Sequence, residues 1–477
     1  MICNGLAGAF LVALTIPVLG AGPASQPQAR VIRVEKTGGD FDSIQKGIDG
    51  APEHAVIQIG PGTFEGSLKI TRPVVLEGAG WDRTIIVATL PPLDEVQAAG
   101  KDLEEAYRQA LMAKNQAAAD QLSADFRHKF LQPGLRVEDA RGVEIRNLKI
   151  TAAGRDVPKD SALREMVLVT FVGSLAKVEN CVVTGSPGDG VHIVSDSVVE
   201  VSNSLVAGHW GTGIEIGSRD YTFARGTVSD CDVRNCHYAS IWVAHEAEAT
   251  IQRCRIWGAA WHGIRYDHAS PTITHNRIYG NARCGIYASG DTQATVSENL
   301  FVGNDLAGYP SNKDTISGNT FVLNNVDYEN SGIVVIGDSR PTIERNIFFN
   351  MPCGVSLWRE GDKKSPDYGK LPSADIRRNV FWQVADPIRR SAEEPTEQQP
   401  WEAVPLEAQM ECEVVDPGFV DAEKEDYALS AGSALREKKI GVADPVKGES
   451  PFPLQEEEIA IIPEGETREY DKWKQVK

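Results

Sequence analysis

Five side chains able to take part in acid–base, ionic or stacking chemistry recur every 22 to 27 residues in the middle of the chain. They are His192, Glu215, Trp242, Arg265 and Tyr287. Each is the second residue after a glycine or serine in a short run of alternating apolar residues, so all five point outward if these runs are stacked strands. A strand spacing of about 4.8 Å makes this column about 19 Å long. The mixture of aromatic rings with ionisable groups predicts a face that binds a sugar chain.

The chemistry that these groups favour is proton abstraction beside a carboxylate, as in β-elimination on a uronic-acid polymer or C5 epimerisation of its sugars. Both reactions need a partner for the substrate carboxylate, a base for the C5 proton and a proton donor. Arg265 can pair with a carboxylate through two hydrogen bonds. His262 or His192 can be the base and Tyr287 the donor, and Glu215 is a further catalytic candidate. The candidates for substrate binding are Trp242, Trp210, Trp261, Tyr238, Asp267, Asp189 and Arg283.

Two other functions remain open on the same residues. Paired carboxylates can hydrolyse a glycosidic bond, and Asp189 and Glu215, in adjacent repeats, fit such a pair better than Glu215 and Asp267 do. A non-catalytic carbohydrate-binding or surface protein would need only the stacking and hydrogen-bonding groups. Calcium could assist any of these functions, but no acid cluster is dense enough for us to assign a metal site, and no other cofactor is expected.

The elements that position these residues follow from a repeat between about residues 143 and 382. Its phrase is a β-branched residue, two variable residues, a small polar residue, one more residue, then an aliphatic residue or Phe. Successive centres lie 33, 23, 27, 23, 22, 23, 20, 27 and 33 residues apart, which is typical of a solenoid with one coil per repeat. The centres, where we expect a sharp bend, are Leu148, Cys181, Ser204, Cys231, Cys254, Asn276, Asn299, Asn319, Asn346 and Asn379. Buried free thiols explain the cysteines in this column, and a Cys231–Cys254 disulfide is the alternative.

A third strand follows most of the phrases. The predicted third strands are residues 190–195, 213–218, 240–245, 263–268, 285–290, 332–337 and 354–359. Three short strands per coil, with β-branched residues pointing inward, predict an all-β parallel β-helix of eleven to twelve coils. Along these strands the outward column should continue from Tyr287 to Pro310, Val334 and Ser356.

Two segments at the ends of the array resemble those of pectin-lyase-like right-handed parallel β-helix proteins. The first, Phe41 to Ala88, resembles their capping helix, here Ser43 to Gly50, and their first coils with a Pro-Gly-Thr-Phe turn. The second, Val415 to Leu435, resembles their Asp-Pro-x-Phe-Val-Asp ending. The resemblance covers about residues 31–440 and implies a right-handed coil and a secreted protein. It does not imply one activity, because the superfamily includes lyases, hydrolases, epimerases and non-catalytic proteins.

Two shorter resemblances concern activity. Residues 262–268 are similar to a segment of mannuronan C5-epimerases, but they lack its Pro and its final Asp. Residues 209–218 resemble a segment of polygalacturonases, which are inverting hydrolases, but their Asp-Asp pair is not found in this chain. Neither resemblance assigns a role to a residue.

The whole chain of 477 residues is expected to divide into three parts. Residues 1–24 resemble a signal peptide, 31–390 form the β-helix with a helical insertion at about 91–132, and 391–477 form a wrapping segment and an acidic tail. We expect a monomer that is secreted or periplasmic, with no membrane association after signal removal. The net charge of −19 argues against binding to nucleic acid. The expected partner is an acidic polysaccharide, which requires a groove that is locally basic.

Overall fold

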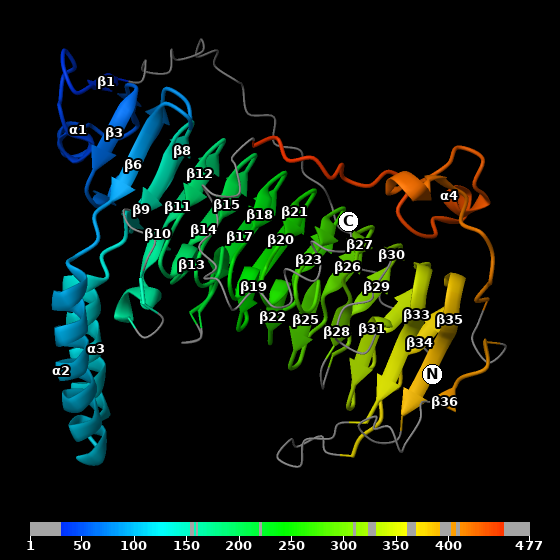
Figure 1. Ribbon diagram of the computed structural model, residues 1–477. Helices are drawn as coiled ribbons and strands as arrows, with labels where there is room; N and C mark the ends of the chain where they lie inside the picture. The colour runs from blue at the N-terminus through cyan, green and yellow to red at the C-terminus, as the bar shows by residue number, and fades with distance from the viewer. Residues whose placement is uncertain are drawn as a thin grey trace, which may run out of the picture.

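A computed structural model describes residues 30–152, 157–158, 161–218, 222–308, 312–322, 331–359, 369–391, 402–406 and 411–452. The predicted signal peptide lies outside these residues. Figure 1 shows a row of stacked coils that runs from the blue N-terminal strands to the yellow and orange strands β33 (Ile347–Trp358) and β35 (Val380–Ser391). Equivalent strands of neighbouring coils pair in parallel throughout the array, which confirms the predicted parallel β-helix.

The first row of strands forms a 13-stranded sheet, so the array has slightly more coils than the eleven to twelve expected. Its strands are β1 (Val31–Val34), β2 (Ala55–Ile59), β5 (Val74–Gly78), β8 (Arg141–Arg146), β11 (Leu175–Glu179), β14 (Val198–Ser202), β17 (Arg225–Ser229), β20 (Glu248–Gln252), β23 (Thr272–Thr274), β26 (Thr295–Ser297), β29 (Thr315–Ser317), β32 (Thr342–Glu344) and β34 (Asp375–Arg377). Burial alternates along each strand because every second side chain enters the coil interior.

The other strands form two rows that the long strands β33 and β35 join into one sheet. The second row contains β3 (Gly62–Glu65), β6 (Thr84–Ala88), β9 (Lys149–Ala152), β12 (Val182–Thr184), β15 (Leu205–Ala207), β18 (Asp232–Arg234), β21 (Arg255–Trp257), β24 (Arg277–Tyr279), β27 (Leu300–Val302) and β30 (Thr320–Val322). The third row contains β4 (Leu68–Ile70), β7 (Leu135–Glu138), β10 (Val167–Val172), β13 (Asp189–Val194), β16 (Ile214–Ile216), β19 (Ala239–Ala244), β22 (His262–Asp267), β25 (Ile286–Ser289), β28 (Leu306–Gly308) and β31 (Ser331–Ile336). All seven predicted third strands are confirmed in this row or in the second half of β33.

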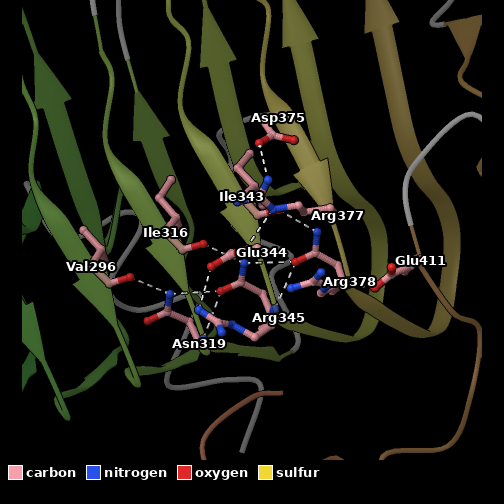
Figure 2. A network of polar contacts seen from close by, with 12 residues as sticks. Val296, Ile316, Asn319, Ile343, Glu344, Arg345, Asp375, Arg377, Arg378 and Glu411 are labelled. Atoms are coloured by element: carbon pink, nitrogen blue, oxygen red, sulfur yellow. Dashed lines mark hydrogen bonds and ion pairs between the residues drawn. The ribbon is translucent and has the colours of Figure 1, made fainter. Parts of the chain in front are cut away.

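The bends between the first and second rows carry the predicted column of small polar residues. Five asparagines stack there, and each amide oxygen accepts the backbone N–H of the column residue one coil earlier at 2.9 Å, which is Cys254 for Asn276 and an asparagine for the other four. Figure 2 shows one of them, Asn319, whose amide also donates to the carbonyl of Val296 at 2.9 Å. In the earlier coils Cys181, Cys231 and Cys254 take these positions as buried free thiols, so the Cys231–Cys254 disulfide is not formed.

A stack of aromatic rings fills the interior of the later coils, beside the asparagine column. Phe301, Phe321, Phe348 and Phe381 follow one another with ring centroids 4.4, 5.2 and 5.0 Å apart. Each is the last residue of its repeat phrase and is almost fully buried. Because each ring contacts the rings of the neighbouring coils, the stack fixes the register of one coil on the next.

Four α-helices stand outside the coils among the described residues. Helix α1 (Ile44–Gly50) begins after Ser43, as predicted, and buries Ile44 and Ile48. Helices α2 (Leu93–Met112) and α3 (Gln116–Phe130) form the predicted insertion, and Figure 1 shows them side by side, extending away from the N-terminal coils. Helix α4 (Ala434–Lys438) belongs to the C-terminal segment. None of the described helices has the length and apolar character needed to cross a membrane.

The C-terminal segment contains β36 (Glu402–Ala403), β37 (Phe419–Asp421), η3 (Ala422–Lys424) and β38 (Asp426–Leu429), and β37 and β38 form a hairpin. After these elements the chain turns back along the coils. Figure 1 shows this segment in orange and red, running from the last coils toward the earlier ones. Its last described residue, Phe452, packs edge-on against Trp81 with ring centroids 6.0 Å apart. The backbone carbonyl of Phe452 also accepts a hydrogen bond from Arg234 at 3.5 Å. Phe452 therefore covers part of the second row, where it packs with Val182, Leu205 and Ala207.

Candidate functional site

The column of outward side chains predicted from the sequence lies along the third row. Backbone register pairs His192 with Glu215, Glu215 with Trp242, Trp242 with Arg265, and Arg265 with Tyr287. Beyond Tyr287 the prediction of Pro310 is wrong, because Ala307 in β28 pairs with Tyr287. The coil that contains β28 is the shortest of the repeat, so its third strand begins earlier than expected. Pro310 itself falls outside the described residues.

The column also continues in the other direction, toward the N-terminus. His192 pairs with Thr170, Thr170 with Arg136, and Arg136 with Lys69. The sequence reasoning missed the two cations because the repeat phrase starts only near residue 143 and the helical insertion separates β6 from β7. The signal that could have found them is the alternation in β4 and β7, where Lys69 and Arg136 each lie between two buried apolar residues.

A groove of about 970 Å³ lies over the N-terminal half of the column. One side is lined by column residues from Lys69 to Trp242 and by Tyr238. The other side is lined by the end of α3, including Arg127 and His128, and by η1 (Ala162–Glu165). An ion pair of 3.6 Å between Arg127 and Glu165 links the two. The helical insertion therefore contributes directly to the groove.

Three ionisable side chains meet within this groove. Nε2 of His192 lies 2.9 Å from Oδ2 of Asp189 and 3.1 Å from Oε2 of Glu215. The other oxygen of Asp189 accepts the backbone N–H of Thr212. Burial alone lowers the pKa of His192, but the charges and hydrogen bonds of Glu215 and Asp189 outweigh burial and raise this pKa to about 10. Without another cation between the carboxylates, His192 is therefore an imidazolium at neutral pH and is not a base.

At the N-terminal end of the groove, one carboxylate binds both of the cations that the sequence reasoning missed. Glu138 lies 3.1 Å from the guanidinium of Arg136 and 2.6 Å from the ammonium of Lys69. Hydrogen bonds from Arg136 and Lys69 lower the pKa of Glu138 to about 2. Two cations share one anion, so this end of the groove keeps a net positive charge.

Around Arg265, the predicted binding residues contact one another. Asp267 accepts two hydrogen bonds from Arg265, at 2.6 and 3.0 Å, and one from the indole N–H of Trp242 at 2.7 Å. Arg265 also donates to the hydroxyl of Tyr238. Trp242 is only 4% exposed, so it forms part of the groove wall and is not the open stacking platform that we expected.

Three of the predicted catalytic residues, His262, Arg265 and Tyr287, come together next to this cluster. The rings of His262 and Tyr287 lie 4.6 Å apart, and Cζ of Arg265 lies 5.2 Å from the Tyr287 ring. Burial, together with the charges of Arg265 and Arg283, lowers the pKa of His262 to about 3. His262 is therefore a neutral imidazole at neutral pH, and its buried Nδ1 has no hydrogen-bond partner among the described residues.

The remaining predicted binding residues lie at the turns. Trp210 is covered on both faces, because Cζ of Arg164 lies 3.5 Å from its centre and the parallel ring of His237 lies 4.3 Å from it. Two groups this close to one ring centre must lie on opposite sides, so Trp210 offers no face to a sugar. Arg283 lies over the ring of Trp261 at 4.0 Å and covers one face of this ring.

Comparison with protein-family models agrees with this geometry. A model described as "Right handed beta helix region" matches residues 165–321 and 269–366. This match spans less than half of the chain, and together with the parallel strand pairing it identifies the fold as a right-handed parallel β-helix. No curated protein sequence matches this β-helix protein.

Among solved structures, the β-helix protein is similar to three carbohydrate-acting enzymes at low identity. The periplasmic alginate epimerase AlgG is 12% identical over 76% of this chain and 77% of its own, with a TM-score of 0.48. The A-module of the Azotobacter vinelandii mannuronan C-5 epimerase AlgE4 is 14% identical over 72% and 92%, with a TM-score of 0.47. The pectate lyase Pel9A is 13% identical over 64% and 80%, with a TM-score of 0.45. At these identities and TM-scores the likeness assigns no activity to this chain.

The spacing of the carboxylates in the β-helix protein bears on the hydrolase alternative. The ligand oxygens of Asp189 and Glu215 lie within 4.8 Å of one another. Inverting hydrolases hold their two carboxyl groups about 6.5–9.5 Å apart, to leave room for a water molecule, and retaining hydrolases about 5–5.5 Å apart. The inverting hydrolysis that the polygalacturonase resemblance suggested is therefore not supported by this pair.

Proposed function

We propose that this protein acts on a uronic-acid-containing polysaccharide by abstracting the C5 proton, with β-elimination or C5 epimerisation as the outcome. The observation that supports the proposal is the closeness of three side chains: the rings of His262 and Tyr287 lie 4.6 Å apart, and Cζ of Arg265 lies 5.2 Å from the Tyr287 ring. We assign the roles of base, proton donor and carboxylate partner to His262, Tyr287 and Arg265. The groove beside them is lined by both cations and carboxylates, and its N-terminal end, where Lys69 and Arg136 share Glu138, suits an anionic polymer.

His262 fits the role of base because its ring is neutral at neutral pH. The residue is only 3% exposed, so substrate must displace neighbouring side chains to reach its ring nitrogens. A pKa of about 3 keeps its ring nitrogens free of a second proton at every pH where the protein would work. The same low pKa makes it a weak base in the resting site. A bound carboxylate would offset the charge of Arg265 and so raise the proton affinity of His262 when substrate is present.

Arg265 retains hydrogen-bonding capacity for a substrate carboxylate. A guanidinium has five N–H groups. Asp267 accepts two of these, from Nε and Nη2, and Tyr238 accepts one from Nη1. One N–H on each of the two terminal nitrogens remains, which is enough to bind a carboxylate while Asp267 holds the guanidinium in place. Tyr287, 5.2 Å from this guanidinium by its ring centre, is positioned to donate the proton.

The setting of the protein follows from the same proposal. A polymer of this kind lies outside the cytoplasm, so we place the protein in the periplasm or outside the cell, as the signal-like N-terminus suggests. The groove and the contact of His262, Arg265 and Tyr287 are formed within one chain, so a monomer is sufficient. Calcium is not required by any of the three roles.

A screen of alginate, pectate and other uronates tests the reaction class. Elimination produces an unsaturated sugar that absorbs in the ultraviolet, epimerisation changes the sugar composition without chain cleavage, and hydrolysis yields reducing ends without absorbance. We expect Tyr287→Phe and His262→Gln to lower the rate by about 10²- to 10⁴-fold, the usual contribution of general acid–base groups. His275→Gln is the control, because His275 is an exposed histidine paired with Glu298 at 2.5 Å. Activity that survives in both variants contradicts the assignment.

Hydrolysis by a pair of carboxylates is the second candidate, because Asp189 and Glu215 both line the groove and their oxygens lie within 4.8 Å of one another. It predicts new reducing ends that depend on these two carboxylates and not on Tyr287. The same screen separates the two reactions, since only one of them produces an unsaturated sugar. A protein that binds a uronate and gives neither product is a binding module.

A further inference from the structure

Outside the contact of His262, Arg265 and Tyr287, one cluster in the groove has no part in proton abstraction. It consists of Asp189, His192 and Glu215, and we call it the Asp-His-Glu cluster. Its members come from neighbouring third-row strands, with His192 and Glu215 directly paired in register. Glu215 lies two rungs from Arg265, which is about 10 Å at the usual strand spacing. The cluster is therefore a separate site within the groove, whereas His262, Arg265 and Tyr287 are not among the residues that line this groove.

The atoms of this cluster are spaced like the ligands of one metal ion. Zinc binds histidine nitrogen and carboxylate oxygen at about 2.0–2.2 Å, which puts neighbouring ligand atoms about 3.0–3.4 Å apart in octahedral or tetrahedral geometry. The two distances from Nε2 of His192 to the carboxylate oxygens are 2.9 and 3.1 Å. All three ligand atoms lie within 4.8 Å of one another, so a small rotation of one carboxylate completes the set.

Charge and hydrogen bonding also suit an ion in this place. As a cluster of side chains alone, one Nε2–H must serve two carboxylates, and only one of the two hydrogen bonds can be straight. A divalent ion would contact all three groups and would balance both negative charges while the imidazole stays neutral. The nearest cations along the column, Arg136 and Arg265, are each two rungs from a member of the cluster and are held by Glu138 and Asp267.

The surroundings resemble those of a catalytic metal site more than those of a structural one. The N–H of Thr212 holds the outer oxygen of Asp189, which is the kind of second contact that orients metal ligands. The side chains of Asp189 and His192 are 23% and 19% exposed, and both line the groove. Three protein ligands beside open space leave positions for water or for a substrate oxygen.

We propose that Asp189, His192 and Glu215 bind one divalent first-row transition-metal ion, with Zn²⁺ as the model. An imidazole with two carboxylates suits this class of ion. Calcium prefers six to eight oxygen ligands and is expected to bind weakly. In the groove, the ion would take a carboxylate or hydroxyl oxygen of the sugar next to the reacting one. This last role rests on the proposed function, whereas metal binding itself does not.

Metal binding is tested without substrate, so its outcome is independent of the proposed reaction. The full chain is stripped with a chelator and titrated calorimetrically with ZnCl₂ alone and with CaCl₂ alone. We expect the wild type to bind zinc at one site that is lost in both His192→Gln and Asp189→Asn and kept in the control His275→Gln. Zinc should also raise the unfolding temperature of the wild type and of the control, and not that of the two variants. Equal zinc binding by all four proteins, no binding by the wild type, or tighter binding of calcium would overturn the proposal.

A second measurement needs no variant and covers the case in which a substitution prevents folding. Crystals of the wild-type chain are soaked in ZnCl₂, and anomalous scattering is recorded at the zinc edge. A peak between Asp189, His192 and Glu215 supports the site. A peak only at surface histidines, such as His275 beside Glu298, refutes it.

Discussion

Replacing one asparagine of the bend column should cost a large part of the stability of the coil stack. Asn319 is fully buried, and its amide takes part in four hydrogen bonds, of which Figure 2 shows the one to Val296. Its oxygen accepts from the backbone N–H and from the amide of Asn299, at 2.9 and 3.0 Å. Its nitrogen donates to the carbonyl of Val296 at 2.9 Å and to the amide oxygen of Asn346 at 3.0 Å. Asn319→Ala removes all four.

The magnitude follows from which groups lose their partner. The amide of Asn299 keeps its bond to the carbonyl of Ile273, and the amide oxygen of Asn346 keeps the backbone N–H of residue 319. The backbone N–H of Asn299 loses its acceptor and the carbonyl of Val296 loses this donor. Each buried group left unsatisfied costs about 1–3 kcal/mol, so we expect a loss of about 2–6 kcal/mol. Asn319→Ser should cost less, because the hydroxyl of Ser204 accepts a backbone N–H in the same column at 3.1 Å.

Urea unfolding followed by circular dichroism measures this loss, and hydrogen exchange at the amide of Asn299 locates it. Thr315→Ala is the matched control, since Thr315 is an exposed residue in the first strand of the same coil. An exposed substitution of this kind should stay within about 0.5 kcal/mol of the wild type. If Asn319→Ala is as stable as Thr315→Ala, the column does not stabilise the stack in the way described.

Two further predictions concern buried ionisable groups. Burial lowers the pKa of His209 to about 4 and, with the charges of Arg265 and Arg283, lowers that of His262 to about 3. The unfolded chain takes up these protons near pH 6.5, so stability should fall as the pH drops below 6.5, by about 3 kcal/mol for each histidine by pH 4. Urea unfolding at pH 7 and pH 5 should give a shallower pH slope for His209→Gln than for the wild type, and an equal slope contradicts the prediction. Of the seven described cysteines, only Cys412 is partly exposed, and burial raises the pKa of Cys181 and of Cys236 to about 12. A thiol reagent followed by mass spectrometry should therefore label Cys412 in the native protein and the other six cysteines only after unfolding. Rapid labelling of Cys231 or Cys254 in the native protein would contradict the burial of the bend column.

The fold could be predicted from the sequence because each coil repeats the same pattern of inward-pointing apolar residues and a small polar residue at the bend. The repeat phrase marks the inward residues of two strands and the bend between them, so counting along the chain was enough to align His192 with Glu215 and Arg265 with Tyr287. Counting residues from one repeat to the next gave the wrong residue where the number of residues per coil changes. The column reached Ala307 and not Pro310 in the shortest coil, and Arg136 lies beyond the insertion, outside the repeat.

The candidate site was harder to predict because register does not determine which neighbour a side chain contacts. Arg265 turns toward Asp267, two residues along the same strand, and Trp242 joins the same carboxylate. The pairing of Trp210 with Arg164 depends on the η1 segment, which lies two coils earlier. These contacts depend on side-chain rotamers and on loops, which carry no periodic signal in the sequence.

The regular pairing of the third row has a consequence for the length of the ligand. Rungs of the column are about 4.8 Å apart, a distance set by backbone hydrogen bonds, whereas the repeat of a polysaccharide is set by its rings and linkages. Unless the sugar repeat distance equals the strand spacing, each successive sugar is displaced further from the corresponding rung of the column. Only a limited run of sugars can then meet the rungs in phase, and lengthening an oligosaccharide beyond that run should add little to its affinity.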